Sequence, residues 1–345
     1  MKTCYSWFSG CGGSDVGMEL AGYRSVGGIE WHNSAANIYD ANQLVPVLRS
    51  DIMAVESVPS VDLLWISPPC PSFSIANVNK GETDRDIALA THIANLISGS
   101  NPRHVAIENV RGYRDSRSLQ IIIDRLTQLG YSIDVAIYNA ADYGTPTTRQ
   151  RLIVRASLDK LHPVVKTHQK PSNQLGLFDL PAWVSWWDVV RDRVSELPVS
   201  KLTDNQARSL DDAIGHKLID GIGHDNRFGY RLSNEPSFTV TASINKHPIR
   251  LLIERCGYRD SPNIYHNVPA PTIRSAQHID NKGSYRVAYN ILDNYDCYAA
   301  DVRCLAAWQG FPADYDWGDN RGEAGRAIGN AVPPPLAKAI ALSFG

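Results

Sequence analysis

The sequence lacks the features that mark exported, membrane-spanning or metal-stapled proteins. None of its six cysteines belongs to a Cys-x-x-Cys pair, so neither a disulfide framework nor a zinc site is indicated. No apolar run reaches the roughly 18 residues that a membrane helix needs, and the first ten residues do not resemble a secretory segment. We therefore expect a protein of a reducing cytoplasm, with no metal and no membrane partner.

The sequence also lacks a strong excess of charge. Its 34 Lys and Arg residues nearly balance 36 Asp and Glu residues, for a net charge of −2. Nucleic-acid-binding domains are often basic, so any such surface must be local. Basic residues cluster between Arg227 and Arg286, but acidic neighbours dilute them, and a solvated surface explains them equally well.

The pattern of the first half predicts an α/β domain. Up to about residue 158, short apolar runs alternate with helical stretches, which is typical of a mostly parallel sheet covered by helices on both faces. The candidate strands are residues 3–8, 25–30, 61–67, 104–108, 133–139 and 151–156. We expect a doubly wound, Rossmann-like sheet.

The pattern changes after residue 164, where prolines, asparagines and short β-prone pieces such as residues 238–241 predict a smaller, irregular β-rich domain. Regular structure then returns. Asp301 is a suitable N-cap for a helix that ends before Gly310, and Pro333-Pro334-Pro335 opens a final apolar helix. We expect this last helix, residues 336–342, to pack on the first domain.

Four polar or glycine-rich features follow the predicted strands: residues 10–13, Glu30, residues 68–70 and Glu108. In an open α/β sheet, ligands bind outside the carboxyl ends of the strands, so these features should share one edge. The glycines permit a tight turn beside free helix N–H groups, and Glu30 has the spacing of a carboxylate that accepts ribose hydroxyls. A nucleoside-bearing cofactor is favoured over phosphate binding, because no Lys-Ser/Thr follows the glycines; a glycine turn without a ligand is the alternative.

Cys70 stands in Ser67-Pro68-Pro69-Cys70-Pro71, a turn that two prolines stiffen before the thiol. An unpaired cysteine is most often a small buried hydrophobic residue. Its place at the expected crevice, with Glu108 at the same edge, instead favours a nucleophile paired with an acid. A helix cap or a surface charge is the alternative for Glu108.

With these motifs in order, the chain resembles the cytosine-C5 DNA methyltransferases. The resemblance rests on residues 8–13, 67–74, 108–110, 143–151, 309–312 and 329–334, and covers about residues 1–156 and 300–345. It implies a methyltransferase fold with a catalytic, cofactor-binding domain of residues 1–163 and 313–345. A target-recognition domain of residues 164–300 and a hinge helix of residues 301–312 would complete it.

The resemblance also implies the reaction. Methyl would pass from S-adenosyl-L-methionine to C5 of a cytosine flipped out of a specific duplex DNA sequence, leaving S-adenosyl-L-homocysteine. Cys70 would add to C6, Glu108 would bind N3 and the exocyclic amine, and Arg149 and Arg151 would hold O2 and organise both. Phosphate contact or a surface strand is the alternative for the two arginines.

The implied cofactor-binding residues come from both ends of the chain. They are Phe8, Ser9, Gly10, Cys11, Gly12, Gly13, Glu30, Trp31, Asp51, Ile52, Pro68, Asn330, Ala331 and Val332. Glu30 would bind the ribose, Trp31 would lie beside the adenine, and Asp51 with Ile52 would meet the adenine edge. A plain core residue is the alternative for Trp31.

The chain departs from the family pattern at Pro71, Thr147, Cys304 and Ala307, where Gln, Gln, Glu and Arg are usual.

Two other functions stay open. A tRNA-directed methyltransferase shares the chemistry, although its Cys-Phe-Thr signature is absent from the middle domain; a silent nucleic-acid-binding relative would not need the four catalytic residues together. We expect a monomer of prokaryotic or phage type, in a bacterial cytoplasm or a phage-infected host, with a restriction endonuclease as a conceivable functional partner.

Overall fold

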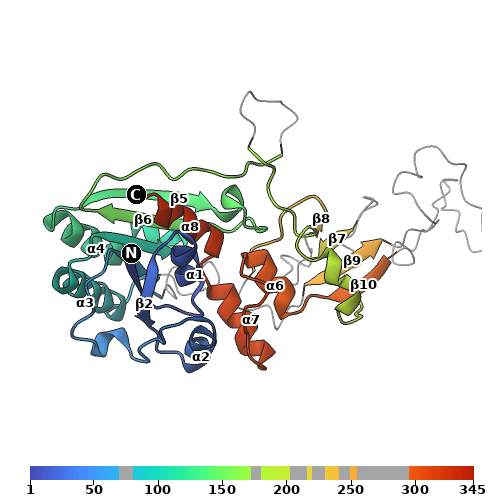
Figure 1. Ribbon diagram of the computed structural model, residues 1–345, viewed down its shortest axis with the longest axis horizontal. Helices are drawn as coiled ribbons and strands as arrows, with labels where there is room; N and C mark the ends of the chain where they lie inside the picture. The colour runs from blue at the N-terminus through green and yellow to red at the C-terminus, as the bar shows by residue number, and fades with distance from the viewer. Residues whose placement is uncertain (70–80, 172–179, 203–215, 220–229, 241–248, 255–294) are drawn as a thin grey trace, which may run out of the picture. The chain divides into compact units, whose positions relative to one another are not determined.

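The computed structural model describes residues 1–69, 81–171, 180–202, 216–219, 230–240, 249–254 and 295–345 (Figure 1). The chain forms two compact units: Met1–Asp192 with Asn234–Lys246 and Asp301–Gly345, and Arg193–Ser233 with His247–Ala300. Residues 164–192 and 234–246, which the sequence analysis assigned to target recognition, therefore group with the first unit. Within the described part of the chain, no helix is long and apolar enough to cross a membrane.

The first unit is built on a sheet with the strand order β2-β1-β3-β4-β6-β5. Its strands are β1 (Thr3–Trp7), β2 (Arg24–Ile29), β3 (Leu63–Ile66), β4 (His104–Asn109), β5 (Ser132–Asn139) and β6 (Gln150–Ser157). The pairs β1 with β2, β1 with β3, and β3 with β4 are parallel, whereas β6 is antiparallel to β4 and β5. The predicted mostly parallel α/β sheet is confirmed, and the reversal of β6 is an addition to it.

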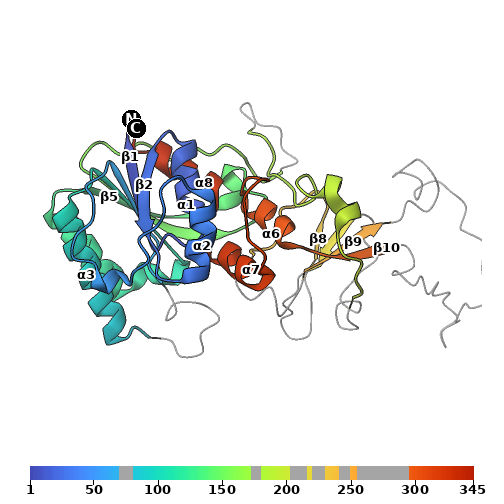
Figure 2. The same cartoon turned by 60° about the horizontal axis from the view of Figure 1, so that its bottom comes forward.

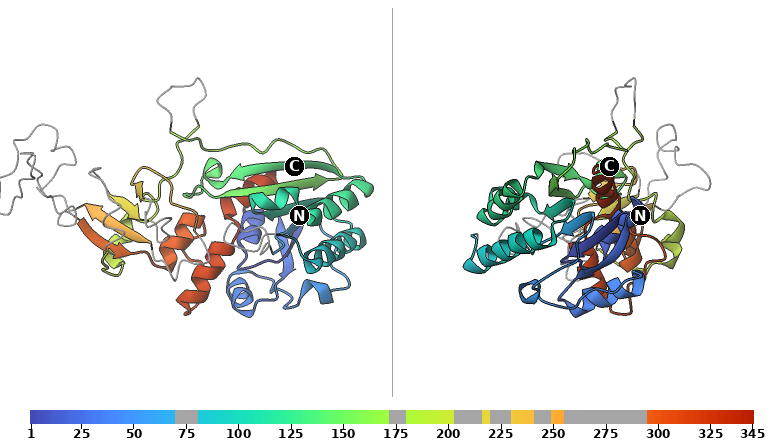
Figure 3. Two further views of the ribbon diagram at one scale, coloured as in Figure 1. Left: turned by 180° about the vertical axis from the view of Figure 1, so that it is seen from behind. Right: turned by 60° about the vertical axis from the view of Figure 1, so that its left-hand side comes forward.

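Alternation along the strands gives this sheet two hydrophobic faces. Leu64 and Ile66 of β3 pack in a cluster that includes residues of α3 (Asp84–Ser100) and α4 (Arg117–Gln128). Leu63 and Trp65 pack on the other side, with residues of α1 (Gly13–Leu20) and α8 (Pro334–Leu342). Figure 3 shows α3 and α4 lying together beside the sheet. Because successive strand residues point to opposite faces, β3 is apolar throughout, as a strand covered on both sides must be.

The end of the chain packs on the first unit, as predicted. The helix α6 (Val302–Gln309) begins after Asp301, whose carboxylate accepts the N–H of Cys304, and it ends at Gly310, where φ is 80°. The helix α8 contributes to the core cluster of α1, and the two chain ends lie side by side, with Lys2 Nζ donating to the carbonyl of Gly345 (Figure 2). The helix α7 (Arg321–Asn330) was not predicted, because its three glycines weaken the helical pattern.

The second unit contains an antiparallel sheet with the strand order β10-β9-β7-β8. These strands are β7 (Lys217–Ile219), β8 (Tyr230–Leu232), β9 (Arg250–Glu254) and β10 (Tyr295–Ala299). Ile219 and Leu252 form its small hydrophobic cluster. The predicted β-rich character is confirmed. The β-prone piece of residues 238–241 belongs to the first unit. Its described residues, 238–240, do not form a regular strand, and the neighbouring Ser237 makes an isolated bridge to Thr147.

Close packing of α1 on α8 predicts a steric effect at Gly17. A Cβ there would lie 2.4 Å from the Cβ of Ala337 and 2.6 Å from the carbonyl oxygen of Pro334. We expect Gly17→Ala to lower the free energy of unfolding by about 1–3 kcal/mol through overpacking. Urea unfolding measures this change.

Gly99→Ala in α3 is the matched control, since no heavy atom of the described residues lies within 4 Å of its Cβ position. This substitution should be neutral or should stabilise the protein by up to about 1 kcal/mol, because alanine favours helix more than glycine does. Equal destabilisation by the two substitutions would show that the contact between α1 and α8 is not close.

Candidate active site

The carboxyl ends of four strands meet at one edge of the first sheet. The loop of residues 8–13 follows β1, Glu30 follows β2, Pro68 follows β3, and Glu108 lies near the end of β4. Because β6 runs opposite to β4, its first residues reach the same edge, and Leu152 is paired with Asn109. The features predicted to converge do so, apart from Cys70, which lies outside the described residues.

The loop after β1 has a bent backbone that Glu30 holds in place. Phe8 and Gly10 both have φ of 57°, in the left-handed region that is costly for a residue with a Cβ. The N–H of Gly10 donates to Glu30 Oε2 at 2.8 Å, and the N–H of His32 donates to Glu30 Oε1 at 2.7 Å. One carboxylate therefore fixes the loop to the end of β2.

The side of this loop next to Gly10 has room for a nucleoside-bearing cofactor. A Cβ at Gly10 would meet no heavy atom of the described residues within 4 Å, so space is open beside the backbone. Each Glu30 oxygen keeps a second lone pair that can accept a ribose hydroxyl. The Trp31 side chain is 65% exposed, so its interpretation as a core residue is wrong and its ring can stack on a planar base.

Two other predicted cofactor residues, Ser9 and Cys11, use their side chains in contacts within the protein. The Ser9 hydroxyl donates to the Ser6 carbonyl at 3.1 Å. The buried Cys11 thiol donates to the Ala327 carbonyl at 3.6 Å, and burial raises its pKa to about 12. Asp51 accepts the N–H of Met53 at 3.0 Å and so caps the short turn Ile52–Ala54.

Residues 330–332, which the resemblance places at the cofactor and which we call the wall, contact the loop. The carbonyl oxygen of Val332 lies 2.3 Å from the position that a Cβ would take at Gly13, and the Cβ of Ala331 lies 3.4 Å from it. Only glycine can occupy that position without displacing the backbone of the wall. Asn330 ends α7 with an exposed side chain.

Glu108 forms an ion pair with Arg151 at the edge of the sheet. Arg151 Nε lies 2.8 Å from Glu108 Oε1, and both side chains are largely buried. Next to this pair, Asn109 Nδ2 donates to the Pro68 carbonyl at 3.2 Å. The end of β4 is thus tied to the turn that leads towards Cys70, and a carboxylate and a guanidinium stand beside it.

Arg149 has other partners than Arg151, although both belong to the predicted pair. Its buried Nη1 donates to the carbonyls of Val240 at 3.0 Å and Gly329 at 2.9 Å. Thr147, one of the departures from the family pattern, donates to the Phe238 carbonyl at 2.7 Å. The segment 147–149 therefore binds the backbone of residues 238–240 and the end of α7.

A buried carboxylate beneath the loop, Asp15, was not singled out by the sequence analysis. It accepts hydrogen bonds from Ser6 and Tyr39 at 3.0 Å and from Ser14 at 3.2 Å. Burial raises its pKa to about 6, and these hydrogen bonds offset only part of that effect. An acidic residue in the first turn of a helix is ordinarily interpreted as a favourable charge near the helix N-terminus, so no sequence pattern indicates this network.

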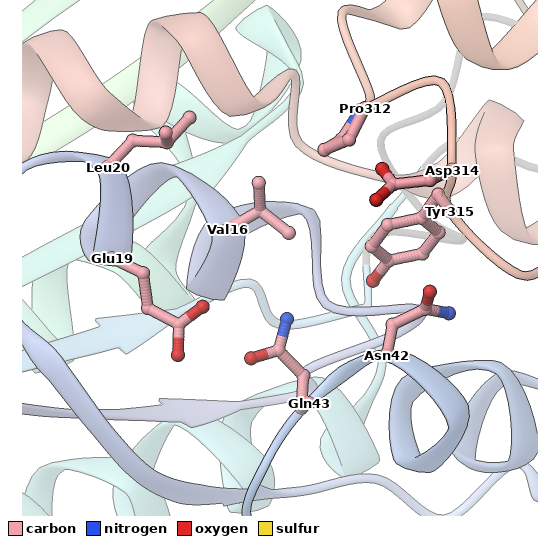
Figure 4. A pocket seen from close by; sticks show the side chains of 8 residues that line it. All are labelled: Val16, Glu19, Leu20, Asn42, Gln43, Pro312, Asp314 and Tyr315. Carbon is pink, nitrogen blue, oxygen red and sulfur yellow. The ribbon is translucent and has the colours of Figure 1, made fainter.

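A pocket of about 360 Å³ adjoins the same loop from another direction (Figure 4). It is lined by Val16, Glu19, Leu20, Asn42, Gln43, Pro312, Asp314 and Tyr315. No predicted catalytic or cofactor residue in the described part of the chain lines it. This pocket is therefore separate from the edge that holds Glu30 and Glu108.

Comparison with known proteins adds a family match. Residues 2–345 match the family described as C-5 cytosine-specific DNA methylase. The Type II methyltransferase M.HindV of Haemophilus influenzae is 27% identical over 355 residues, covering 99% of this chain and 95% of the relative. M.FnuDI of Fusobacterium nucleatum is 26% identical, covering 97% and 92%. A solved DNMT2 variant of Spodoptera frugiperda aligns over 98% of each chain with a TM-score of 0.62 at 16% identity, a likeness that shows the fold alone.

The raised pKa of Asp15 predicts a pH dependence of stability. Its pKa is about 6 in the folded protein against an ordinary value of 3.8, so its contribution to stability is present below pH 3.8 and is lost as the pH rises through about 6. Relative to Asp15→Asn, the wild type should lose on the order of 2–3 kcal/mol of unfolding free energy between pH values of about 4 and 7.

Urea unfolding of both proteins across this pH range tests the prediction, because other titrating groups cancel in the difference. A difference between wild type and Asp15→Asn that stays constant with pH would contradict the role of Asp15.

Proposed function

The chain belongs to the C-5 cytosine-specific DNA methylase family, and from this premise we propose how its residues methylate cytosine. It is a DNA cytosine-C5 methyltransferase. The residue roles below are supported above all by one observation: the ion pair between Glu108 and Arg151, adjacent to the turn that carries Pro68.

Cys70 is the nucleophile in this proposal. Its thiolate adds to C6 of the cytosine, and the electron pair of the C5–C6 double bond becomes available at C5. C5 takes the methyl group, a base removes the C5 proton, and the bond between Sγ and C6 breaks to restore the aromatic ring. A stiff Pro-Pro turn suits this role, because it orients the thiol before the base arrives.

Glu108 and Arg151 stabilise the base while charge develops on it. The carboxyl group of Glu108 binds N3 and the exocyclic amine, which offsets the charge that attack at C6 places on the ring. Arg151, held by Glu108 at 2.8 Å, presents its remaining N–H groups to O2. Arg149 serves as a positioning residue, since its described hydrogen bonds go to the carbonyls of Val240 and Gly329.

The cofactor is S-adenosylmethionine, which supplies the methyl group as an electrophilic sulfonium substituent. Gly10 leaves room for it beside the loop, Glu30 accepts its ribose hydroxyls, and Trp31 stacks on its adenine. The wall of residues 330–332 packs against Gly13 of the loop and bounds the proposed site there.

Double-stranded DNA is the substrate in this account, with the target base flipped out, because a stacked cytosine cannot be approached on both faces. We assign the reading of the DNA sequence to residues 164–300, of which residues 193–233 and 247–300 form the second unit, and we assign the hinge to residues 301–312. The enzyme acts as a monomer in a bacterial cytoplasm or a phage-infected host, and its similarity to Type II methyltransferases makes a restriction endonuclease a candidate functional partner.

Covalent trapping tests the nucleophile. With S-adenosylmethionine present, we expect the wild type to form a denaturation-resistant adduct with duplex DNA in which 5-fluorocytosine replaces cytosine throughout. After methyl transfer, C5 carries fluorine in place of the hydrogen that a base must remove before the bond between Sγ and C6 can break. Cys70→Ser should form none, and Glu108→Gln should methylate ordinary DNA at least about 100-fold more slowly than wild type. Gel electrophoresis detects the adduct, and transfer of radiolabelled methyl measures the rate.

S-adenosylhomocysteine binding by both variants is the control, since neither change should abolish it. An adduct with Cys70→Ser would exclude Cys70 as the nucleophile. Methylation of tRNA by the wild type, with none of DNA, would instead favour the tRNA-directed activity.

A further inference from the structure

Tyr315 packs against the cofactor loop. Its hydroxyl donates to the carbonyl of Cys11, the residue at the centre of the loop. The hydroxyl oxygen also lies 2.9 Å from the position that a Cβ would take at Gly12, where φ is 89°. Tyr315 is thus in direct contact with two consecutive loop residues, Cys11 and Gly12. No catalytic or cofactor-binding role has been assigned to Tyr315 itself.

The hydroxyl of Tyr315 is a permanent donor at this place. The side chain is only 8% exposed, and burial raises its pKa well above the ordinary value for tyrosine. It therefore keeps its proton around neutral pH and can act as a hydrogen-bond donor. Figure 4 shows the ring beside Asp314, with the hydroxyl directed towards the side where Asn42 and Gln43 lie.

Two neighbouring rings keep Tyr315 from moving. The ring centroids of Phe311, Tyr315 and Trp317 are each 4.9 Å from the other two. Phe311 also lies against the loop, with its ring edge 3.1 Å from the Cβ position of Gly13. Such a cluster of three rings has few alternative packings, so it can hold a hydroxyl at a fixed position.

The segment is also fixed to the helix α2 (Asn33–Asn42). Asn42 Nδ2 donates to the Asp316 carbonyl at 2.8 Å, and the N–H of Asp316 donates to Asn42 Oδ1 at 2.8 Å. This reciprocal pair holds the backbone between Tyr315 and Trp317. The loop is therefore held from two sides, by Glu30 through Gly10 and by Tyr315 through Cys11.

We propose that Tyr315 is a positioning residue for cofactor binding: it holds the carbonyl of Cys11 and so keeps the loop in the shape that receives S-adenosylmethionine. The inference rests on the proposed cofactor site. The benefit of such preorganisation lies in affinity, because a loop that is already ordered loses less entropy when the ligand binds. Without the hydroxyl, the left-handed residues of the loop can relax.

Isothermal titration with S-adenosylhomocysteine tests the proposal. Tyr315→Phe removes one hydrogen bond and keeps the ring, and we expect it to weaken binding about threefold to tenfold. The KM for S-adenosylmethionine should rise by a similar factor while kcat stays close to that of the wild type. Partial unfolding alone would lower the active fraction and leave KM unchanged, so the split between KM and kcat separates positioning from stability.

Tyr131→Phe is the matched control. Tyr131 is 5% exposed, and its hydroxyl donates to the Pro102 carbonyl near the amino ends of β4 and β5, at the opposite edge of the sheet. It should bind S-adenosylhomocysteine as the wild type does. Wild-type affinity in Tyr315→Phe, or an equal loss in Tyr131→Phe, overturns the proposal. Absence of binding by the wild type overturns the cofactor site itself, and the inference with it.

Discussion

The carboxylate of Glu30 is the constraint on which the site depends. It sits at the end of β2 and accepts one backbone N–H from the loop after β1 and one from His32. Charge-assisted hydrogen bonds of this kind are stronger than neutral ones, so they can hold a backbone that includes left-handed residues. With the loop fixed, Gly13 can meet the wall at Val332, and α1 can start beneath it. The proposed cofactor site and the packing at the start of α1 therefore both depend on the Glu30 carboxylate.

The reversed strand β6 is the second element on which the account depends. If it were parallel to β4, Arg151 would lie at the far edge of the sheet from Glu108. The antiparallel pairing brings the start of β6 to the end of β4, where the ion pair forms. The same turn of chain carries Arg149 to the backbone of Val240 and Gly329. Of two arginines separated by one residue, Arg151 thus pairs with Glu108, the proposed acid, whereas Arg149 binds the surrounding backbone.

The sequence predicts the sheet well because its strands are short apolar runs that end in glycine, proline or acid, and all six occur within two residues of the predicted bounds. It also predicts the edge where Glu30, Pro68 and Glu108 meet. Side-chain direction could not be predicted in the same way. The family resemblance placed Arg149 beside Arg151 and Cys11 at the cofactor, but it did not indicate that the Arg149 guanidinium and the Cys11 thiol bind backbone carbonyls from distant segments. Asp15, Tyr315 and the glycine-rich α7 depend on tertiary contacts that leave no local pattern.

The central claim is that this edge of the sheet methylates C5 of cytosine in DNA. Bisulfite sequencing tests it most directly, on DNA from a host that has no cytosine-C5 methylation of its own and expresses either the wild type or Cys70→Ser. The account predicts protected cytosines at one recurring sequence with the wild type and none with the variant. Complete conversion of cytosine in both samples, with the wild-type protein present and folded, would contradict it.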